Sequence, residues 1–277
     1  MTGDFLTSMA HASRARVAAA RSLASEDHLH AQLEHAPAPP GLKLQAGFDL
    51  IAELKLRSPA AGILSAASDA IESRVQQYAQ AGAAAVSVLT EPERFDGSLL
   101  HLARSTAMLS PLRVPVMRKD FITDYYQLLE ARVNGASGVL LIVRMLRQVE
   151  LEKLLLQAHA LGLFVLLEAF DEVDIEIATA LASNWAGDNS KCLIGVNSRD
   201  LRSLQIIPGH LEKLADRLPL AHPRVAESGL VTAEDAARLS AIGYTLALVG
   251  SALMSSAQPL RLVQDMISRG RAAAAMR

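Results

Sequence analysis

The sequence alternates apolar, β-branched segments with helix-type segments from residue 50 almost to its end. A crossover helix between two strands places them parallel, so this alternation restricts the chain to α/β folds. The expected strands are 50–55, 84–90, 114–120, 137–143, 163–169, 192–197, 223–228 and 245–250. The helix-type segments between them include 71–83, 125–136, 149–162, 174–183 and 232–243. Several of these end at a glycine that can close a helix, namely Gly82, Gly135, Gly162 and Gly243.

Eight strands of nearly continuous apolar character indicate a parallel sheet covered by helices, and eight is the number that closes a barrel. We therefore predict a single (β/α)8 TIM barrel of the α/β class, forming one domain over residues 1–277. Residues 1–45 are expected to form an N-terminal helical extension with an amphipathic face that includes Leu6, Met9 and Val17. A doubly wound open sheet is the alternative, but the first strand lacks the G-x-G-x-x-G turn of dinucleotide-binding folds.

Composition excludes several functional classes. The 277 residues carry 27 basic and 29 acidic side chains, which leaves no broad basic face for nucleic acid or anionic lipid. The single cysteine, Cys192, cannot form an internal disulfide or a thiolate zinc site, which is typical of a reducing compartment. No apolar run is long enough to span a membrane, and the first residues lack a secretory signal. We expect a cytoplasmic protein; the Ala/Ser/Arg-rich start leaves a transit peptide as an alternative.

Polar side chains stand at the ends of five expected strands, and barrels of this class carry their catalytic groups at the carboxyl ends of the strands. Charges at strand ends can also be solvated edges or rim salt bridges. Their recurrence at an equivalent depth favours a shared site instead. The residues concerned are Glu53 and Lys55, Lys119, Glu168, Asn197 and Arg199, and Glu227.

Three carboxylates and three cations in a partly dry pocket shift one another's pKa, which is the condition for acid–base chemistry near neutral pH. No side chain resembles an activated nucleophile, because Cys192 begins its strand and no serine occupies a G-x-S-x-G elbow. The histidines at 28, 30 and 35 lack partners at metal-ligand spacing. We therefore expect lyase or isomerase chemistry without a metal.

The seventh and eighth strands end in small residues, Glu227-Ser228-Gly229 and Gly250-Ser251. Small side chains leave backbone N–H groups open to an anion, and barrels commonly bind phosphate at these two strands. Tight turns favour glycine and serine for conformational reasons as well. The position of both corners predicts a small phosphorylated substrate.

Seven strings occur in order over about residues 50 to 256. They are IAELKLRSPAAG (51–62), SVLTEPERFDGS (87–98), RKDFITDYYQLLEARVNGAS (118–137), LLIV (140–143), IGVNSRDL (194–201), VAESGL (225–230) and LVGSALM (248–254). Together they resemble the indole-3-glycerol-phosphate synthases of tryptophan biosynthesis. The resemblance implies a cofactor-free barrel that converts 1-(2-carboxyphenylamino)-1-deoxyribulose 5-phosphate to indole-3-glycerol phosphate, CO2 and water.

The resemblance also implies roles for individual residues. Lys119 would be the general acid that protonates the substrate carbonyl oxygen, and Glu168 the catalytic carboxylate that manages proton transfer in the dehydration. The positions that would orient the catalytic groups and the substrate hydroxyls are Glu53, Asn197 and Glu227. The positions that would bind anionic groups and keep the pocket ordered are Lys55, Ser58 and Arg199. The phosphate cradle corresponds to Ser228, Gly229, Gly250 and Ser251, and the apolar contacts of the aromatic ring to Phe95 and Phe121.

The chain departs from the family pattern at several positions. Ala60 and Ala61 replace a polar or basic pair, Arg144 a small residue, and Phe170 a histidine. The stretch before the first strand, GLKLQAGFDL (41–50), also differs from the family's usual aromatic-containing approach. These differences leave three alternatives: a paralogue with altered substrate or reduced activity, an isomerase of another aminosugar phosphate, and a non-catalytic binding protein. We expect a monomer or a weak homo-oligomer.

Overall fold

The computed structural model describes residues 5–59, 62–64, 71–188 and 191–277. Over these residues, eight parallel strands close into a barrel in the order β1-β10-β9-β8-β7-β6-β5-β4. The strands are β1 (Asp49–Leu54), β4 (Ala85–Leu89), β5 (Val116–Lys119), β6 (Gly138–Ile142), β7 (Phe164–Ala169), β8 (Cys192–Asn197), β9 (Arg224–Glu227) and β10 (Leu246–Val249). Because β1 pairs with both β4 and β10, the predicted barrel is confirmed and the open-sheet alternative is wrong.

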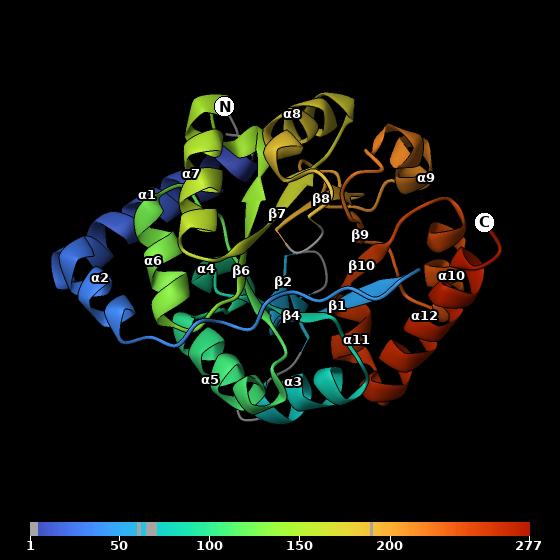
Figure 1. Ribbon diagram of the computed structural model, residues 1–277, viewed down its shortest axis with the longest axis horizontal. Helices are drawn as coiled ribbons and strands as arrows, with labels where there is room; N and C mark the ends of the chain where they lie inside the picture. The colour runs from blue at the N-terminus through green and yellow to red at the C-terminus, as the bar shows by residue number, and fades with distance from the viewer. Residues whose placement is uncertain (1–4, 60–61, 65–70, 189–190) are drawn as a thin grey trace.

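Helices surround the strands, and β1 and β10, from opposite ends of the barrel sequence, lie side by side (Figure 1). The helices are α1 (Phe5–Leu23), α2 (Glu26–Glu34), α3 (Ile71–Gln80), α4 (Pro92–Phe95), α5 (Leu99–Leu109), α6 (Tyr125–Val133), α7 (Gln148–Ala160), α8 (Glu172–Ala182), α9 (His210–Leu214), α10 (Ala233–Ala241), α11 (Ser251–Ser255) and α12 (Pro259–Ala274). Short 3₁₀ helices cover Ser110–Leu112, Val143–Met145, Ser183–Trp185 and Ala215–Arg217. A two-stranded hairpin, β2 (Arg57–Ser58) with β3 (Gly62–Ile63), follows β1. None of the described helices combines the length and the apolar character that a membrane crossing requires.

The N-terminal helices pack on the outside of the barrel. Helix α2 contacts α6, and α1 contacts α6 and the 3₁₀ helix after β6. Leu6, Met9 and Val17 are buried on one face of α1, as the amphipathic pattern predicted. The division into one domain over residues 1–277, with 1–45 as an extension, stays a prediction.

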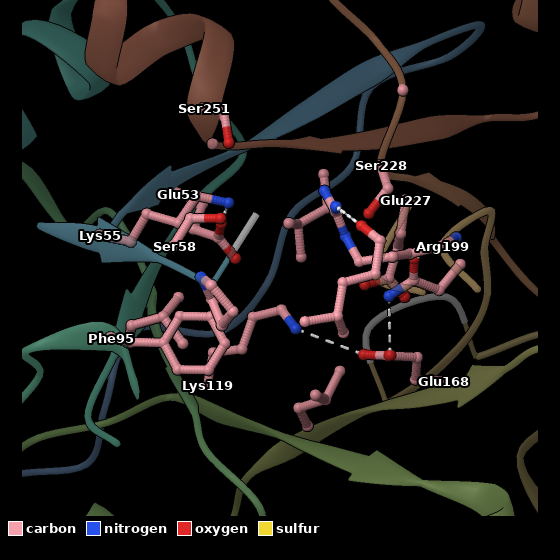
Figure 2. Close-up of a pocket in the computed structure, with 18 of the residues that line it drawn as sticks. Glu53, Lys55, Ser58, Phe95, Lys119, Glu168, Arg199, Glu227, Ser228 and Ser251 are labelled. Atoms are coloured by element: carbon pink, nitrogen blue, oxygen red, sulfur yellow. Dashed lines mark hydrogen bonds and ion pairs between the residues drawn. The ribbon is translucent and has the colours of Figure 1, made fainter. Parts of the chain in front are cut away.

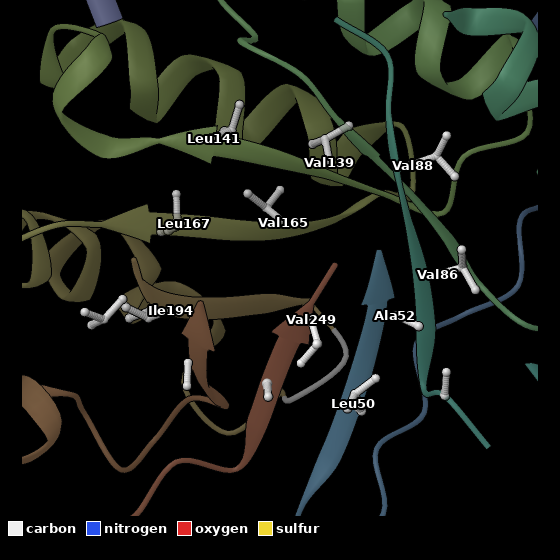
Figure 3. Packing of buried hydrophobic residues seen from close by; sticks show 14 of the residues in the cluster. Leu50, Ala52, Val86, Val88, Val139, Leu141, Val165, Leu167, Ile194 and Val249 are labelled. Atoms are coloured by element: carbon white, nitrogen blue, oxygen red, sulfur yellow. The ribbon is translucent and has the colours of Figure 1, made fainter. Parts of the chain in front are cut away.

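Side chains alternate between the two faces of each strand, and this alternation separates two cores. On β1, Leu50, Ala52 and Leu54 point outward into the layer between sheet and helices, where Figure 3 shows their counterparts from neighbouring strands. Ile51 points into the barrel, where it joins Met117 and other inward residues in a second cluster. The inward side chains therefore form a stack whose upper layer is the floor of the pocket described below.

The predicted helix-closing glycines adopt the left-handed conformation. The φ angles are +91° at Gly82, +81° at Gly135, +75° at Gly162 and +111° at Gly243. At Gly135, a Cβ atom would also lie 2.9 Å from the Thr106 hydroxyl, so both conformation and space favour glycine there.

Truncation of a buried outward-facing leucine tests this packing. Leu141 on β6 is fully buried between sheet and helices. We expect Leu141→Ala to lower the free energy of unfolding by about 2–5 kcal/mol, because it removes apolar contacts and leaves a cavity. Leu156 on α7 is 51% exposed and provides the matched control, for which we expect a change of about 0.5 kcal/mol or less. Urea unfolding monitored by circular dichroism measures both; equal losses would contradict the described core.

Candidate active site

A cavity opens at the carboxyl ends of the barrel strands, and all fourteen residues predicted for the site line it. They are Glu53, Lys55, Ser58, Phe95, Lys119, Phe121, Glu168, Asn197, Arg199, Glu227, Ser228, Gly229, Gly250 and Ser251. Figure 2 shows the labelled side chains among them, such as Glu53, Lys119 and Glu168, converging from different strands on one space. The sequence prediction therefore identified one pocket rather than scattered strand-end charges.

The two-residue repeat of the strands explains this convergence. Lys119 follows inward-facing Met117 by two residues, and Glu168 stands in the same relation to Leu166. Side chains two apart on a strand point to the same face, so the polar groups occupy the next layer above the apolar barrel interior. The apolar layer thus forms the floor beneath the charged one.

Lys119 and Glu168 face each other across the pocket. The Lys119 Nζ atom lies 3.3 Å from Glu168 Oε2, and Asn197 Nδ2 donates to Glu168 Oε1 at 2.9 Å. Burial alone would lower the pKa of Lys119, but the contacting carboxylate of Glu168, together with Glu53, outweighs burial and raises that pKa. Lys119 therefore keeps its proton at neutral pH, which is the state that a general acid requires.

A second ion pair lies beside the first. Lys55 Nζ is 2.8 Å from Glu53 Oε1, and Glu53 is only 3% exposed. Burial would raise the pKa of Glu53, but Lys55, Lys119 and Arg199 outweigh burial and lower it. Gly250 lies against this pair, because a Cβ atom built on it would overlap Glu53 Oε1. A side chain at that corner would displace the Glu53 carboxylate from its present position.

The corner after β9 has an unusual backbone. Ser228 and Gly229 both have positive φ, +66° and +80°. A serine rarely adopts this conformation, so the sharp turn here is held by its surroundings. Ser198 contributes, since its hydroxyl donates to the Ser228 carbonyl oxygen at 3.2 Å. Ser251, at the other corner, is the first residue of α11.

The opposite side of the pocket is aromatic. The rings of Phe95 and Phe121 lie with centroids 6.3 Å apart, and Phe5 meets Phe121 edge to face at 5.9 Å. Figure 2 places Phe95 away from Ser228 and Ser251. The cavity therefore has an apolar, aromatic end and a glycine–serine end, with the charged groups between them.

Sequence reasoning did not identify Phe5 and Leu6 of α1 as pocket residues. The amphipathic pattern of this helix indicated a buried face but not the surface that it covers. The loop after β8 also supplies Leu201, Leu204 and Ile206. Arg199 is tied into this loop, because its Nη1 donates to the Leu204 carbonyl oxygen at 2.5 Å.

A buried ionic cluster beside Lys119 was also missed. Asp120 is 3% exposed and accepts hydrogen bonds from Thr90 Oγ1 at 2.7 Å and Arg118 Nη2 at 2.9 Å. Arg16 of α1 reaches the same carboxylate at 2.7 Å and Glu91 at 3.3 Å. Glu91 in turn caps α4, the short helix that ends in Phe95. The cluster therefore joins the N-terminal helix to the strand end that carries Lys119.

Two of the departures from the family pattern contact each other. The Arg144 guanidinium lies 5.0 Å from the centre of the Phe170 ring and also pairs with Asp171 and with Asp174, the latter at 2.7 Å. Asp174 accepts from the Phe170 backbone N–H at 2.8 Å, and Phe170 is a pocket residue. Arg144 thus fixes the position of Phe170 at the side of the pocket, both directly and through Asp174. The other two departures, Ala60 and Ala61, lie outside the described residues.

Comparisons with known proteins agree on one family. A family model described as indole-3-glycerol phosphate synthase matches residues 6–266. The chain is 37% identical over 268 residues to the indole-3-glycerol phosphate synthase of Mycolicibacterium vanbaalenii, covering 96% of this chain and 94% of that one. It is 42% identical over 221 residues to that of Nocardioides sp., covering 80% of each. A solved structure of thiamine phosphate pyrophosphorylase from Pyrococcus furiosus aligns with TM-score 0.58 at 14% identity, covering 82% of this chain and 96% of that one, and shares the fold alone.

Neutralising Asp120 tests the buried cluster. We expect Asp120→Asn to cost about 3 kcal/mol of unfolding free energy at neutral pH, because Arg118 and Arg16 each lose one of their two carboxylate partners, the one that they share. Burial raises the pKa of Asp120, but Arg118 and Arg16 outweigh it and lower that pKa. The stabilisation is therefore present above the unfolded pKa, near 4, and is lost as pH falls through the folded pKa.

The matched control is Asp96→Asn. Asp96 and Arg57 form an exposed pair at 3.6 Å, for which we expect a loss of at most about 1 kcal/mol. Chemical unfolding at pH 7 and pH 3 measures both variants. A penalty for Asp120→Asn that is small at pH 7, or that does not shrink at pH 3, would contradict the role of the cluster.

Proposed function

The chain belongs to the indole-3-glycerol phosphate synthase family, a family of carboxy-lyases in tryptophan biosynthesis, and from this we propose how its pocket closes an indole ring. The proposed substrate is 1-(2-carboxyphenylamino)-1-deoxyribulose 5-phosphate. One observation carries the proposal. Lys119 and Glu168 face each other at 3.3 Å in a pocket with an aromatic end and a glycine–serine end.

The two ends of the pocket match the two ends of this substrate. The phosphate would lie at Ser228, Gly229, Gly250 and Ser251, where small side chains leave the backbone accessible. The carboxyphenyl ring would lie against Phe95 and Phe121. Lys55 and Arg199 supply positive charge between these ends, where the substrate carboxylate needs compensation.

Ring closure needs an acid at the substrate carbonyl. The ring carbon that bears the carboxylate attacks the carbonyl carbon, and a C–C bond forms while negative charge develops on the carbonyl oxygen. Lys119 gives its proton to that oxygen, and before transfer its charge stabilises the developing oxyanion. The C–CO2 bond then breaks, and its electron pair restores the aromatic ring.

Dehydration completes the indole. The new hydroxyl group takes up one proton and leaves as water, and the adjacent ring CH2 loses one proton as the double bond forms, so the step releases water without a net change in protons. Glu168, held by Lys119 and Asn197, is the carboxylate that accepts and passes on protons in this step. Glu53, Asn197 and Glu227 orient these groups and the substrate hydroxyls. The products are indole-3-glycerol phosphate, CO2 and water.

We also propose that the chain works as one barrel domain in the cytoplasm, as a monomer or a weak homo-oligomer. The single cysteine of the chain has no second cysteine to pair with, which is typical of a reducing compartment. Cys192 is buried on β8, and burial raises the pKa of its thiol to about 12. A thiol that stays protonated and covered takes no part in disulfide exchange.

Removal of the Lys119 ammonium group tests the mechanism. We expect Lys119→Met to reduce kcat by at least about a thousandfold, because the general acid and its charge are both lost. The unfolding transition should persist, since methionine fills most of the same space. The assay follows indole fluorescence as the carboxyphenylamino substrate turns over.

Lys153→Met on exposed α7 is the matched control and should keep full activity. Turnover by Lys119→Met within tenfold of the unaltered protein would refute the assigned role. A folded, unaltered protein that binds the substrate but makes no indole product between pH 6 and 9 would refute the activity itself.

A further inference from the structure

Glu227 is the one carboxylate of the predicted site that takes part in no described hydrogen bond or ion pair. It ends β9, is 1% exposed and lines the pocket. Neither Oε1 nor Oε2 has a hydrogen-bond partner among the described residues. A buried carboxylate without a partner is costly when it is ionised, so its state requires an explanation.

The three cations of the site bind elsewhere. Lys119 Nζ lies 3.3 Å from Glu168, and Lys55 Nζ lies 2.8 Å from Glu53. The Arg199 guanidinium donates to the carbonyl oxygen of its own loop. Each positive group therefore already has an acceptor, and Glu227 is left without a counter-charge in contact.

The surroundings of Glu227 are more negative than positive. The charged groups that act on it are Glu168 from β7, Glu53 from β1 and Lys119 from β5. The residues in register with it are uncharged, Asn197 on β8 and Leu248 on β10. Gly195 makes room for the carboxyl group, because a Cβ there would collide with Glu227 Oε1. An ionised Glu227 would be a third negative charge in this buried layer, and one without a partner in contact.

We propose that Glu227 is a neutral carboxylic acid in the ligand-free protein and donates a hydrogen bond to a substrate oxygen, a hydroxyl or carbonyl of the chain between ring and phosphate. The identity of that oxygen rests on the proposed function; the protonation does not. The proton also changes the balance of the pocket. With Glu227 neutral, the other charged residues of the predicted site, two glutamates against Lys55, Lys119 and Arg199, sum to a formal charge of +1. Asp120 also lines the pocket, but it is paired with Arg118 and Arg16.

The direction of titration agrees with this geometry. Burial, Glu168 and Glu53 raise the pKa of Glu227 well above its ordinary value, against the opposing effect of Lys119. A raised pKa means that the acid keeps its proton at low pH and loses it as pH rises through the folded value. The hydrogen-bond donor is therefore present on the acid side and absent on the alkaline side.

Infrared difference spectroscopy of the ligand-free protein tests the protonation directly. At neutral pH we expect the C=O stretch of a protonated carboxylic acid, which Glu227→Gln removes. The matched control Glu152→Gln changes an exposed carboxylate on α7 and should leave the band in place. If Glu227→Gln leaves the spectrum unchanged, the proposal is overturned, whatever the enzyme's activity.

Thermal unfolding gives a second readout that needs no substrate. A folded pKa above the unfolded one means that stability is fully present below the unfolded value, about 4.3, and declines as pH rises through the folded value. Glutamine never ionises. We therefore expect the Tm of Glu227→Gln to rise relative to the Tm of the unaltered protein as pH increases from 4 to 8. A difference that stays constant, or shifts the other way, would overturn the neutral acid.

Activity separates a hydrogen-bond donor from a space-filling residue. The amide of Glu227→Gln can donate as the neutral acid does, so we expect kcat/KM within about tenfold, whereas Glu227→Ala loses about a hundredfold. For the unaltered protein we expect kcat/KM to fall as pH rises through the folded pKa of Glu227, because the acid loses the proton that it donates. This fall should be absent in Glu227→Gln, since the amide does not ionise. Equal losses in both variants would overturn the donor role. Failure of the unaltered protein to make indole product would refute the proposed function alone, since the infrared band decides the protonation separately.

Discussion

Closure of the barrel by the pairing of β1 with β10 is the constraint on which the rest of the structure depends. Once the sheet is closed, every second side chain of every strand points into the same narrow space. Leu166, Met117 and other apolar residues fill the lower part of that space. The next inward positions can only meet one another at the mouth, which is why Lys119 and Glu168 come within contact although 49 residues separate them.

The charged groups of the predicted site at this mouth are equal in number, three acidic and three basic, but they do not form three ion pairs. Two lysines each contact one carboxylate, and Arg199 turns toward its own loop. Desolvation strengthens these pairs and penalises any charge left alone, so the third carboxylate, Glu227, differs in chemistry from the other two. The proposed neutral state of Glu227 would give carboxyl groups of one residue type different roles in one pocket, as acid–base catalysis requires.

The N-terminal helix belongs to the same arrangement. Phe5 of α1 extends the aromatic end of the pocket, and Arg16 joins Asp120, next to Lys119, to Glu91, the cap of the helix that ends in Phe95. One helix outside the barrel therefore contacts both the aromatic side of the pocket and the strand end that carries the proposed acid. The Arg144–Phe170 contact supports another wall in the same manner. The pocket is built from the strand ends and from the elements that support them.

Local sequence determined the eight strands, the helices with a clear apolar period, their closing glycines and eleven of the fourteen predicted pocket positions; the other three, Ser58, Phe95 and Phe121, came from the family resemblance. It could do so because strand alternation and turn chemistry act over a few neighbouring residues. The family resemblance added roles that the residues alone left open. Tertiary structure decided what depends on contact between distant segments: the place of Phe5, the Arg16–Asp120 cluster, the Arg144–Phe170 pair and the unpartnered carboxyl of Glu227. Burial and the proximity of charges arise only when the chain is folded, and no local pattern encodes them.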